Sequence, residues 1–281
     1  MSYIANTHKQ TEQMLKVCGA DSVEGLFDSI PLDLRPSSFD IPSGRSEFEV
    51  VEHCREIASR NYSHLVNFLG GGFYDHCIPA AVDAIAGRSE FYTAYTPYQP
   101  ELSQGTLQAI YEYQTYMCRL TGMEVANASV YDGGTALYEA CQMALHATGK
   151  QRIVMDGGVN PVYRKMLYSY TANLSIDFCE ISVTHGQSDR NHIFDAVDEN
   201  TAAVILQNPN FFGVIDDHSD IIEHCHSRGI LVIQSVYPVA MSVLKSPGEI
   251  GADIATGEGQ SLGIPLAFGG PYLGFIATRG K

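Results

Sequence analysis

Basic residues are scarce in this sequence. Its 281 residues include 17 Lys and Arg against 32 Asp and Glu, which gives a formal net charge of −15. Binding to nucleic acid or to an anionic membrane requires a basic surface that displaces counterions. The composition therefore predicts that neither is a partner of this protein.

Long apolar runs are also missing. No run approaches the roughly 18 to 20 residues that cross a bilayer. The first residues of the chain are interrupted by Lys9, Glu12 and Lys16, so they lack the apolar core of a signal peptide. We therefore expect a globular, cytoplasmic protein, and its 45% of hydrophobic residues can supply a large core.

The cysteines suggest neither a disulfide framework nor a metal site. The seven cysteines are scattered singly, without C-x-x-C spacing, and their odd number is typical of reduced, structural thiols. His224, Cys225 and His226 are adjacent, whereas metal ligands on a helix usually recur at three- or four-residue steps. We expect no metal site.

The N-terminal part of the chain has the pattern of short helices joined by an extended connector. Asp21 with Glu24, and Ser46 with Glu49, have capping-box spacing. The stretch 31–44 contains three prolines and no sustained periodicity, which predicts an extended connector. We assign residues 1–85 to a helical N-terminal arm.

Helix-like and strand-like patterns alternate from about residue 100 onward. Apolar residues at three- and four-residue steps predict a long helix over 102–121. Further helices are predicted over 135–146, 161–170 (with Asn160 as cap) and 217–227, and strands over 125–130, 152–155, 174–178, 203–206, 230–234, 253–255 and 273–277. Strands of continuous Val, Ile and Leu between helices indicate a mainly parallel sheet covered on both faces. The sequence thus predicts an α/β domain over residues 86–281.

The turn over residues 130–135 is the first candidate site, because parallel sheets bind ligands at the carboxyl ends of their strands. Gly133 and Gly134 permit a tight bend, and the following helix N-terminus would offer N–H groups to a phosphate. Asp132 opposes this interpretation, since its carboxylate would repel an anion. The alternative is a tight turn with Thr135 as the helix cap, and the spacing alone favours it.

The stretch over residues 95–105 is the second candidate. Pro97 and Pro100 hold the backbone extended. The hydrogen-bonding side chains that project from it are Tyr95, Tyr98, Gln99, Glu101 and Gln104. Two interpretations stay open at this point. The stretch offers polar groups to a pocket, or it is a rigid connector in which Ser103 or Glu101 begins the next helix.

Three motifs together support a family resemblance. They are Leu69–Asp75 (LGGGFYD), Tyr95–Gly105 (YTPYQPELSQG) and Gly257–Pro271 (GEGQSLGIPLAFGGP). With them the whole chain resembles glycine dehydrogenase (decarboxylating), the pyridoxal-phosphate-dependent P-protein family of the glycine cleavage system. More narrowly, it resembles the α subunits (subunit 1) of the split bacterial form. Because such subunits are longer, the resemblance implies an aminotransferase-like (type I) large domain whose C-terminal small domain is absent from this chain.

The resemblance also implies an activity and partners. This system oxidatively decarboxylates glycine and passes the aminomethyl group to the lipoyl arm of the H-protein, with a β subunit (subunit 2) as partner. An enzyme that anchors pyridoxal phosphate needs a Schiff-base lysine and, commonly, an acid for the ring nitrogen. By the family's pattern the lysine falls on Gln260, or on Ser261 if the match slips by one, and the acid falls near Gln234. The resemblance therefore implies that the β partner, and not this chain, binds the cofactor covalently.

Roles for both candidate sites follow from the same resemblance. Gly133, Gly134 and Thr135 fall on a vestigial phosphate cradle. The residues implied to reach the partner's active site, where they would position glycine or the lipoyl arm, are Tyr95, Tyr98, Gln99, Glu101 and Gln104. Two other interpretations remain: a structural or regulatory subunit whose stretch 95–104 only packs an interface, and a self-sufficient enzyme that uses another of the six lysines.

Overall fold

The computed structural model describes residues 5–38, 40–66, 68 and 70–280. The chain divides after Val66 into two compact units. The predicted boundary after residue 85 therefore lies inside the second unit. Phe73 stacks on Tyr272, with ring centroids 4.3 Å apart, and Tyr74 lies edge-on to Tyr237. The sequence pattern assigned Phe73 and Tyr74 to the arm. These aromatic contacts join both residues to the sheet domain instead.

The first unit consists of short helices without buried residues. Its elements are α1 (His8–Cys18), η1 (Glu24–Phe27), η2 (Leu32–Leu34) and α2 (Glu47–Ser59). The capping box predicted for Ser46 and Glu49 begins α2 and is confirmed. The box predicted for Asp21 and Glu24 is wrong, because the Ser22 hydroxyl instead accepts a hydrogen bond from the Gly25 N–H (3.0 Å). Capping boxes, rather than a core, stabilise the two α-helices, α1 and α2.

The second unit alternates helices and strands. The helices are α3 (Ala80–Ala86), α4 (Ser89–Tyr92), α5 (Gln104–Thr121), α6 (Gly133–Thr148), α7 (Pro161–Tyr170), α8 (Arg190–Ala196), α9 (Ser219–His226) and α10 (Pro247–Ile250), with 3-10 turns η3 (Pro238–Ser242) and η4 (Gln260–Leu262). The strands are β1 (Val125–Ala126), β2 (Arg152–Asp156), β3 (Asp177–Ile181), β4 (Val183–Thr184), β5 (Gln187–Ser188), β6 (Thr201–Asn208), β7 (Leu231–Val236), β8 (Ile254–Glu258) and β9 (Gly274–Thr278).

Most of the predicted elements are confirmed, including the Asn160 cap of α7. Two strand predictions are wrong in extent. The strand predicted over 125–130 is reduced to β1 and one bridge between Val130 and Gly274. The strand predicted over 174–178 begins only at Asp177, because the Leu174 N–H turns back to bond the Thr171 carbonyl (2.8 Å).

The main sheet has the order β1-β9-β8-β7-β6-β2-β3. β3, β2, β6, β7 and β8 pair in parallel, and β9 is antiparallel to both of its neighbours. The predicted mainly parallel sheet is confirmed. All five parallel strands end at one edge of the sheet, so the loops that follow them meet there.

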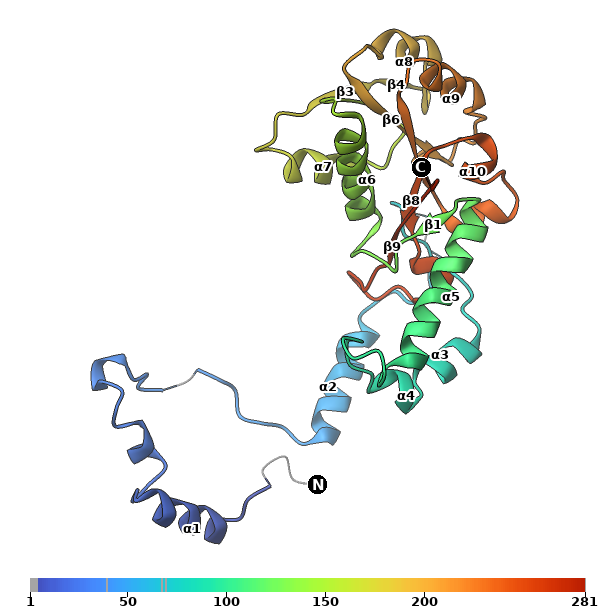
Figure 1. Cartoon of the computed structure of the whole chain (residues 1–281). Coiled ribbons are helices and arrows are strands. Elements are labelled where there is room, and N and C mark those ends of the chain that lie inside the picture. Colours follow the sequence, from blue (N-terminus) through green and yellow to red (C-terminus); the bar gives the residue numbers. More distant parts are fainter. Residues whose placement is uncertain (1–4, 39, 67, 69, 281) are drawn as a thin grey trace. The chain divides into compact units, whose positions relative to one another are not determined.

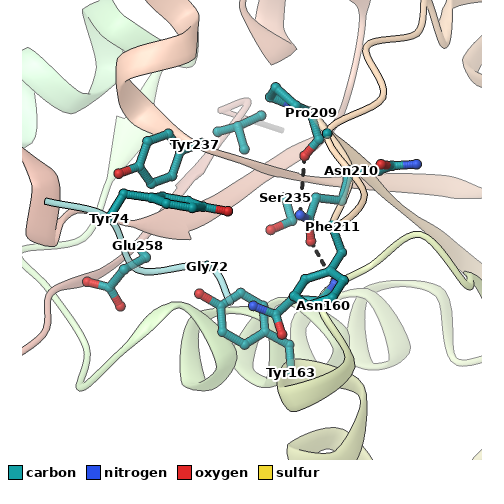
Figure 2. Close-up of a pocket in the computed structure, with 13 residues that line it drawn as sticks. Gly72, Tyr74, Asn160, Tyr163, Pro209, Asn210, Phe211, Ser235, Tyr237 and Glu258 are labelled. Atoms are coloured by element: carbon teal, nitrogen blue, oxygen red, sulfur yellow. Dashed lines mark hydrogen bonds between the residues drawn. The ribbon is translucent and has the colours of Figure 1, made fainter. Parts of the chain in front are cut away.

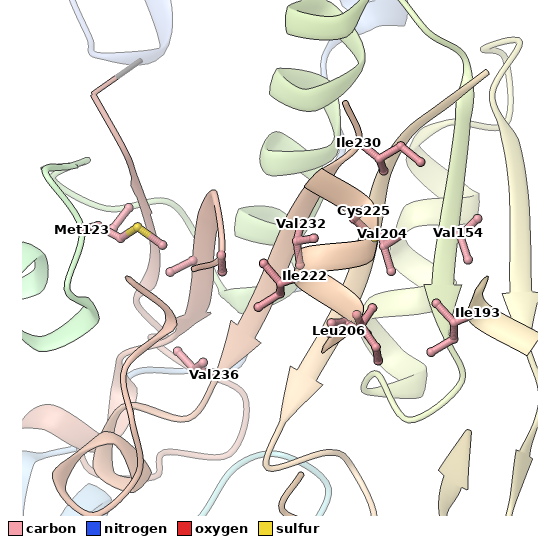
Figure 3. Packing of buried hydrophobic residues seen from close by; sticks show 14 of the residues in the cluster. Met123, Val154, Ile193, Val204, Leu206, Ile222, Cys225, Ile230, Val232 and Val236 are labelled. Atoms are coloured by element: carbon pink, nitrogen blue, oxygen red, sulfur yellow. The ribbon is translucent and has the colours of Figure 1, made fainter. Parts of the chain in front are cut away.

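Each face of the sheet has its own apolar layer. Along β6, Val204 and Leu206 face the layer that holds Ile222 and Cys225 of α9, whereas Ala203 and Ile205 face the layer of α6 and α7. Successive strand residues point to opposite faces, so one continuous apolar run fills both layers. Figure 1 shows α6 and α7 on one side of the strands and α8 and α9 on the other, and Figure 3 shows the α9 layer. The prediction of helices on both faces is confirmed.

Candidate functional site

A cavity of about 190 Å³ lies at the carboxyl ends of β6, β7 and β8. Its polar walls come from Asn160, Gln207, Asn210, Ser235 and Glu258, and its aromatic walls from Tyr74, Tyr163, Phe211 and Tyr237. Figure 2 shows Tyr74, Asn160, Tyr163 and Ser235, which are far apart in the sequence, around one space. The cavity thus lies at the edge where parallel α/β sheets bind ligands.

The N-terminus of α6 adjoins this cavity. Two carboxylates accept hydrogen bonds from the N–H groups of this helix terminus. The Asp132 Oδ1 accepts a hydrogen bond from the Thr135 N–H (2.8 Å), so Asp132 is the cap and the alternative of Thr135 as cap is wrong. The Gly133 N–H donates to Glu258 Oε2 (3.0 Å). The Asp132 carboxylate therefore stabilises the N-terminus of α6 directly. Its presence in this turn is explained without a bound phosphate.

The two glycines of this turn are required by close packing. A Cβ atom on Gly133 would lie 2.5 Å from the Tyr163 hydroxyl oxygen, and one on Gly134 would lie 2.5 Å from the Met166 sulfur. Both distances are far below van der Waals contact. The glycines thus let α7 approach α6, which explains the Gly-Gly pair without a phosphate.

Glu258 is the central polar group of this region. Its side chain is 3% exposed. Besides the Gly133 bond, its Oε1 accepts hydrogen bonds from the N–H groups of Gln260 (3.0 Å) and Leu273 (2.7 Å). Burial raises the pKa of Glu258 and outweighs the opposing effect of these three hydrogen bonds. Burial, and after it the charges of Glu258 and Asp132, likewise raise the pKa of Tyr163.

The two glutamines expected at cofactor positions are both buried. Gln260 is 2% exposed, and its amide N–H₂ donates to the Ile264 carbonyl. Gln234 is 1% exposed on β7, and its amide oxygen has no hydrogen-bond partner among the described residues. Neither side chain lines the cavity. Both amides therefore belong to the interior of the domain.

The cofactor implied by the resemblance, pyridoxal phosphate, does not fit these residues. A Schiff base needs a lysine, and no lysine of the described chain lines the cavity. Lys150, for example, bonds the carbonyls of Thr201 and Gly229 through its Nζ. A phosphate at the α6 terminus would have to displace the Glu258 carboxylate from the Gly133 N–H. The chain's own carboxylate thus occupies the place of the anion.

The second candidate stretch lies on the surface. Tyr95 and Tyr98 are 81% and 80% exposed, and together with Gln99 they line an open hollow of about 580 Å³. Glu101 and Gln104 are exposed but do not line it. Gln104 begins α5 and Ser103 precedes it without a side-chain cap bond. The structure thus brings three of the five predicted residues together.

The other expectations concern metals, thiols and membranes. Among the described residues no group of three or more His, Cys, Asp and Glu side chains is arranged to hold a metal ion. Cys225 is buried, while His224 packs on Phe194 and His226 contacts Asp253. All seven cysteines are free thiols. In the part of the chain that the structure describes, no helix is long and apolar enough to cross a membrane.

Comparison with known proteins identifies the family. The family described as glycine cleavage system P-protein matches residues 1–281. This chain belongs to that family. It is 54% identical over 281 residues to the probable glycine dehydrogenase (decarboxylating) subunit 1 of Oleidesulfovibrio alaskensis, and 55% identical over 276 residues to that of Nitratidesulfovibrio vulgaris. These matches include 100% and 98% of this chain. The chain spans only 63% and 62% of the length of the two relatives.

A solved P-protein has the same fold. The crystal structure of a glycine decarboxylase (P-protein) of the glycine cleavage system, in inhibitor-bound form, superposes with a TM-score of 0.91 at 42% identity, covering 100% of this chain and 63% of that one. A sphingosine-1-phosphate lyase from Burkholderia pseudomallei shares the fold at a TM-score of 0.62 and 14% identity, covering 88% of this chain and 62% of that one. The predicted family and α/β fold class are confirmed.

Several residues that line the cavity were not predicted as site residues. Glu258 lies within the GEGQ motif, and a carboxylate at the end of a buried strand is an unusual feature that could have singled it out. Tyr163 and Ser235 lie in elements that were predicted correctly. Nothing in the local pattern of either residue distinguishes it from a residue of the core.

The cap of α6 can be tested by substitution. Asp132→Ala should lower the free energy of unfolding by about 0.5–2 kcal/mol, because the Thr135 N–H loses its acceptor. Asp132→Asn keeps an oxygen at this position and should lose much less. Urea-induced unfolding of the three proteins measures the difference. Equal stabilities of the alanine variant and the wild type would contradict the capping role.

Proposed function

We propose that this chain acts in a heteromeric glycine decarboxylase as the subunit that does not bind pyridoxal phosphate covalently. The observation that supports this most directly is the Glu258 carboxylate on the Gly133 N–H, where a phosphate would otherwise bind. The buried Gln260, which cannot form an imine, supports the same conclusion. The Schiff-base lysine then belongs to subunit 2, the partner that the name of the relatives, subunit 1, suggests.

The assembled enzyme would decarboxylate glycine oxidatively and transfer the aminomethyl group to the lipoyl arm of the H-protein. Pyridoxal phosphate, bound in subunit 2, would supply the electron-withdrawing ring for loss of carbon dioxide. We place this system in the cytoplasm. The names of the relatives and the match to a solved glycine decarboxylase support the reaction class.

The contribution of this chain to that reaction is the stretch 95–104. Tyr95, Tyr98 and Gln99 form one exposed hollow, so their hydrogen-bonding groups can reach a molecule bound by a partner. Glu101 and Gln104 follow on the same surface-exposed stretch. Together these groups would orient glycine or the lipoyl arm and exclude water. The alternative, a stretch that only packs an interface, predicts no loss of rate on a polar substitution.

A substitution at Tyr98 separates the two interpretations. Tyr98→Ala in the full-length subunit, co-expressed with subunit 2, should lower glycine–bicarbonate exchange with lipoylated H-protein by about tenfold or more, because misplaced reactants lose rate steeply. Tyr92→Ala is the matched control, since Tyr92 is 84% exposed but does not line the hollow. Assembly should be intact in both. An unchanged rate for the Tyr98 variant would support mere packing.

The position of the cofactor has its own test. Borohydride reduction of the assembled enzyme, followed by peptide mass spectrometry, should find the reduced cofactor on a lysine of subunit 2. No lysine of the described part of this chain lines its cavity, so none should be modified. Attachment to this chain would support the self-sufficient alternative and overturn the proposal.

A further inference from the structure

Two side chains that carry hydroxyl groups line the cavity at the ends of β6, β7 and β8. Ser235 is 2% exposed and Tyr163 is 6% exposed, and both line the cavity. Neither hydroxyl takes part in the hydrogen bonds found among the described residues. Neither oxygen is among the fully buried atoms without a partner, so both hydroxyls face the open space of the cavity and can bond a molecule held there.

The charge of the cavity is negative. Glu258 lines it, whereas no Lys, Arg or His of the described chain does. An ionised carboxylate has about four lone-pair positions, and the three backbone N–H groups use two on Oε1 and one on Oε2. One position on Oε2 remains. A buried carboxylate without a cationic side chain beside it favours a cation as the missing partner.

The aromatic walls favour the same kind of ligand. Tyr74, Tyr163, Phe211 and Tyr237 surround the space, and Tyr74 meets Tyr237 edge-on with ring centroids 5.3 Å apart. Ring faces attract ammonium groups, more strongly where water is excluded. Figure 2 shows Tyr74 and Tyr163 approaching the same space from different elements, with Glu258 beside it.

The volume of the cavity and the sign of its charge together define the class of ligand. A volume of about 190 Å³ is much more than one water molecule requires. The N–H groups of Gly133 and Thr135 at the α6 terminus are already bonded to the carboxylates of Glu258 and Asp132, and these negative charges disfavour a phosphate there. We propose that this cavity binds a small organic ammonium ion of about amino-acid size, through Glu258, Ser235, Tyr163 and the aromatic walls. This inference is independent of the proposed role in glycine decarboxylation.

The first experiment compares probes that differ in charge. Ethylammonium, ethanol, acetate and phosphate are titrated into the purified chain at pH 8 and followed by saturation-transfer NMR. Ethylammonium remains protonated at this pH, as lysine does. It should bind saturably and about tenfold or more tightly than ethanol, while acetate and phosphate should not bind. Equal affinity for ethanol, saturable phosphate binding, or no saturable binding of ethylammonium would overturn the proposal.

The second experiment identifies the binding residues. Ser235→Ala and Tyr163→Phe should each weaken ethylammonium binding about threefold to tenfold, which corresponds to one lost hydrogen bond. Glu258→Gln should weaken it at least about tenfold. Tyr131→Phe is the control, because Tyr131 is 87% exposed and does not line the cavity. If Glu258→Gln does not fold, the two hydroxyl variants decide the outcome, and undiminished binding in both would refute the assignment.

Discussion

Gly274→Ala should lower the free energy of unfolding by about 3 kcal/mol or more, because this substitution overfills a closed site. Gly274 is buried at the start of β9. A Cβ atom there would overlap the Asp132 backbone oxygen and lie 2.8 Å from the Val130 Cγ2. Backbone atoms cannot rotate away as a side chain can. Relief therefore requires β9 to move relative to the turn that begins α6.

The movement would disturb several contacts at once. Gly274 and Val130 exchange two backbone hydrogen bonds of 2.8 and 3.0 Å. The neighbouring Leu273 N–H donates to Glu258, which in turn accepts from Gly133. A shift of β9 thus reaches the cap of α6 through Glu258. We expect the variant to lose stability and to weaken ethylammonium binding together.

Urea-induced unfolding measures this prediction, and a second glycine supplies the control. Gly105 lies in the first turn of α5, and a Cβ atom there would meet nothing within 4 Å. Gly105→Ala should be neutral or more stable by up to about 1 kcal/mol, since alanine favours a helix. Similar stabilities for the two alanine variants would show that β9 tolerates the extra atom.

The helices and the parallel strands were predictable from the sequence because their signals are local. The three- and four-residue steps of α5 and the apolar runs of β6 and β7 depend on neighbours within a few residues. The strand predicted over 125–130 failed because its pairing depends on β9, far away in the chain. Local β-propensity does not indicate how much of an edge segment finds a partner.

The site was predictable only in part, for a related reason. The sequence indicated a tight turn and a helix start at Gly133, and both are present. It did not indicate that the carboxylate of Glu258, 125 residues away, accepts a hydrogen bond from the Gly133 N–H at the start of that helix. That contact exists because the order of strands in the sheet brings the end of β8 beside α6. Without this order, Asp132 remained an unexplained charge next to a phosphate-like turn.

The aromatic boundary residues illustrate the same dependence. Phe73 and Tyr74 fall within residues 1–85, which the sequence pattern assigned to the N-terminal arm. Their partners, Tyr272 and Tyr237, come from the other end of the chain. Long-range aromatic contacts therefore join Phe73 and Tyr74 to the second unit, and the sequence next to these residues does not reveal their partners.

Glu258→Gln should lower the free energy of unfolding by about 1–3 kcal/mol. The amide oxygen can still accept from Gln260 and Leu273, but the amide N–H₂ then faces the Gly133 N–H, and two buried donors lack an acceptor. Glu139→Gln is the matched control, because it makes the same change at an exposed position on α6. Its stability should be within about 0.5 kcal/mol of the wild type.

The stability difference between the wild type and Glu258→Gln should depend on pH. This dependence tests whether burial or the three hydrogen bonds dominate the pKa of Glu258. Burial raises the pKa of Glu258 above its ordinary value of 4.5, so the folded protein binds this proton more tightly than the unfolded chain does. The wild type should therefore lose stability, through this group, as the pH rises from about 4.5 through the folded pKa, and the amide variant should not. The gap between the two proteins should be widest at acid pH and should narrow to a plateau above the folded pKa. A gap that widens with rising pH would mean that the three N–H groups outweigh burial, and that the carboxylate is already satisfied without a cation beside it.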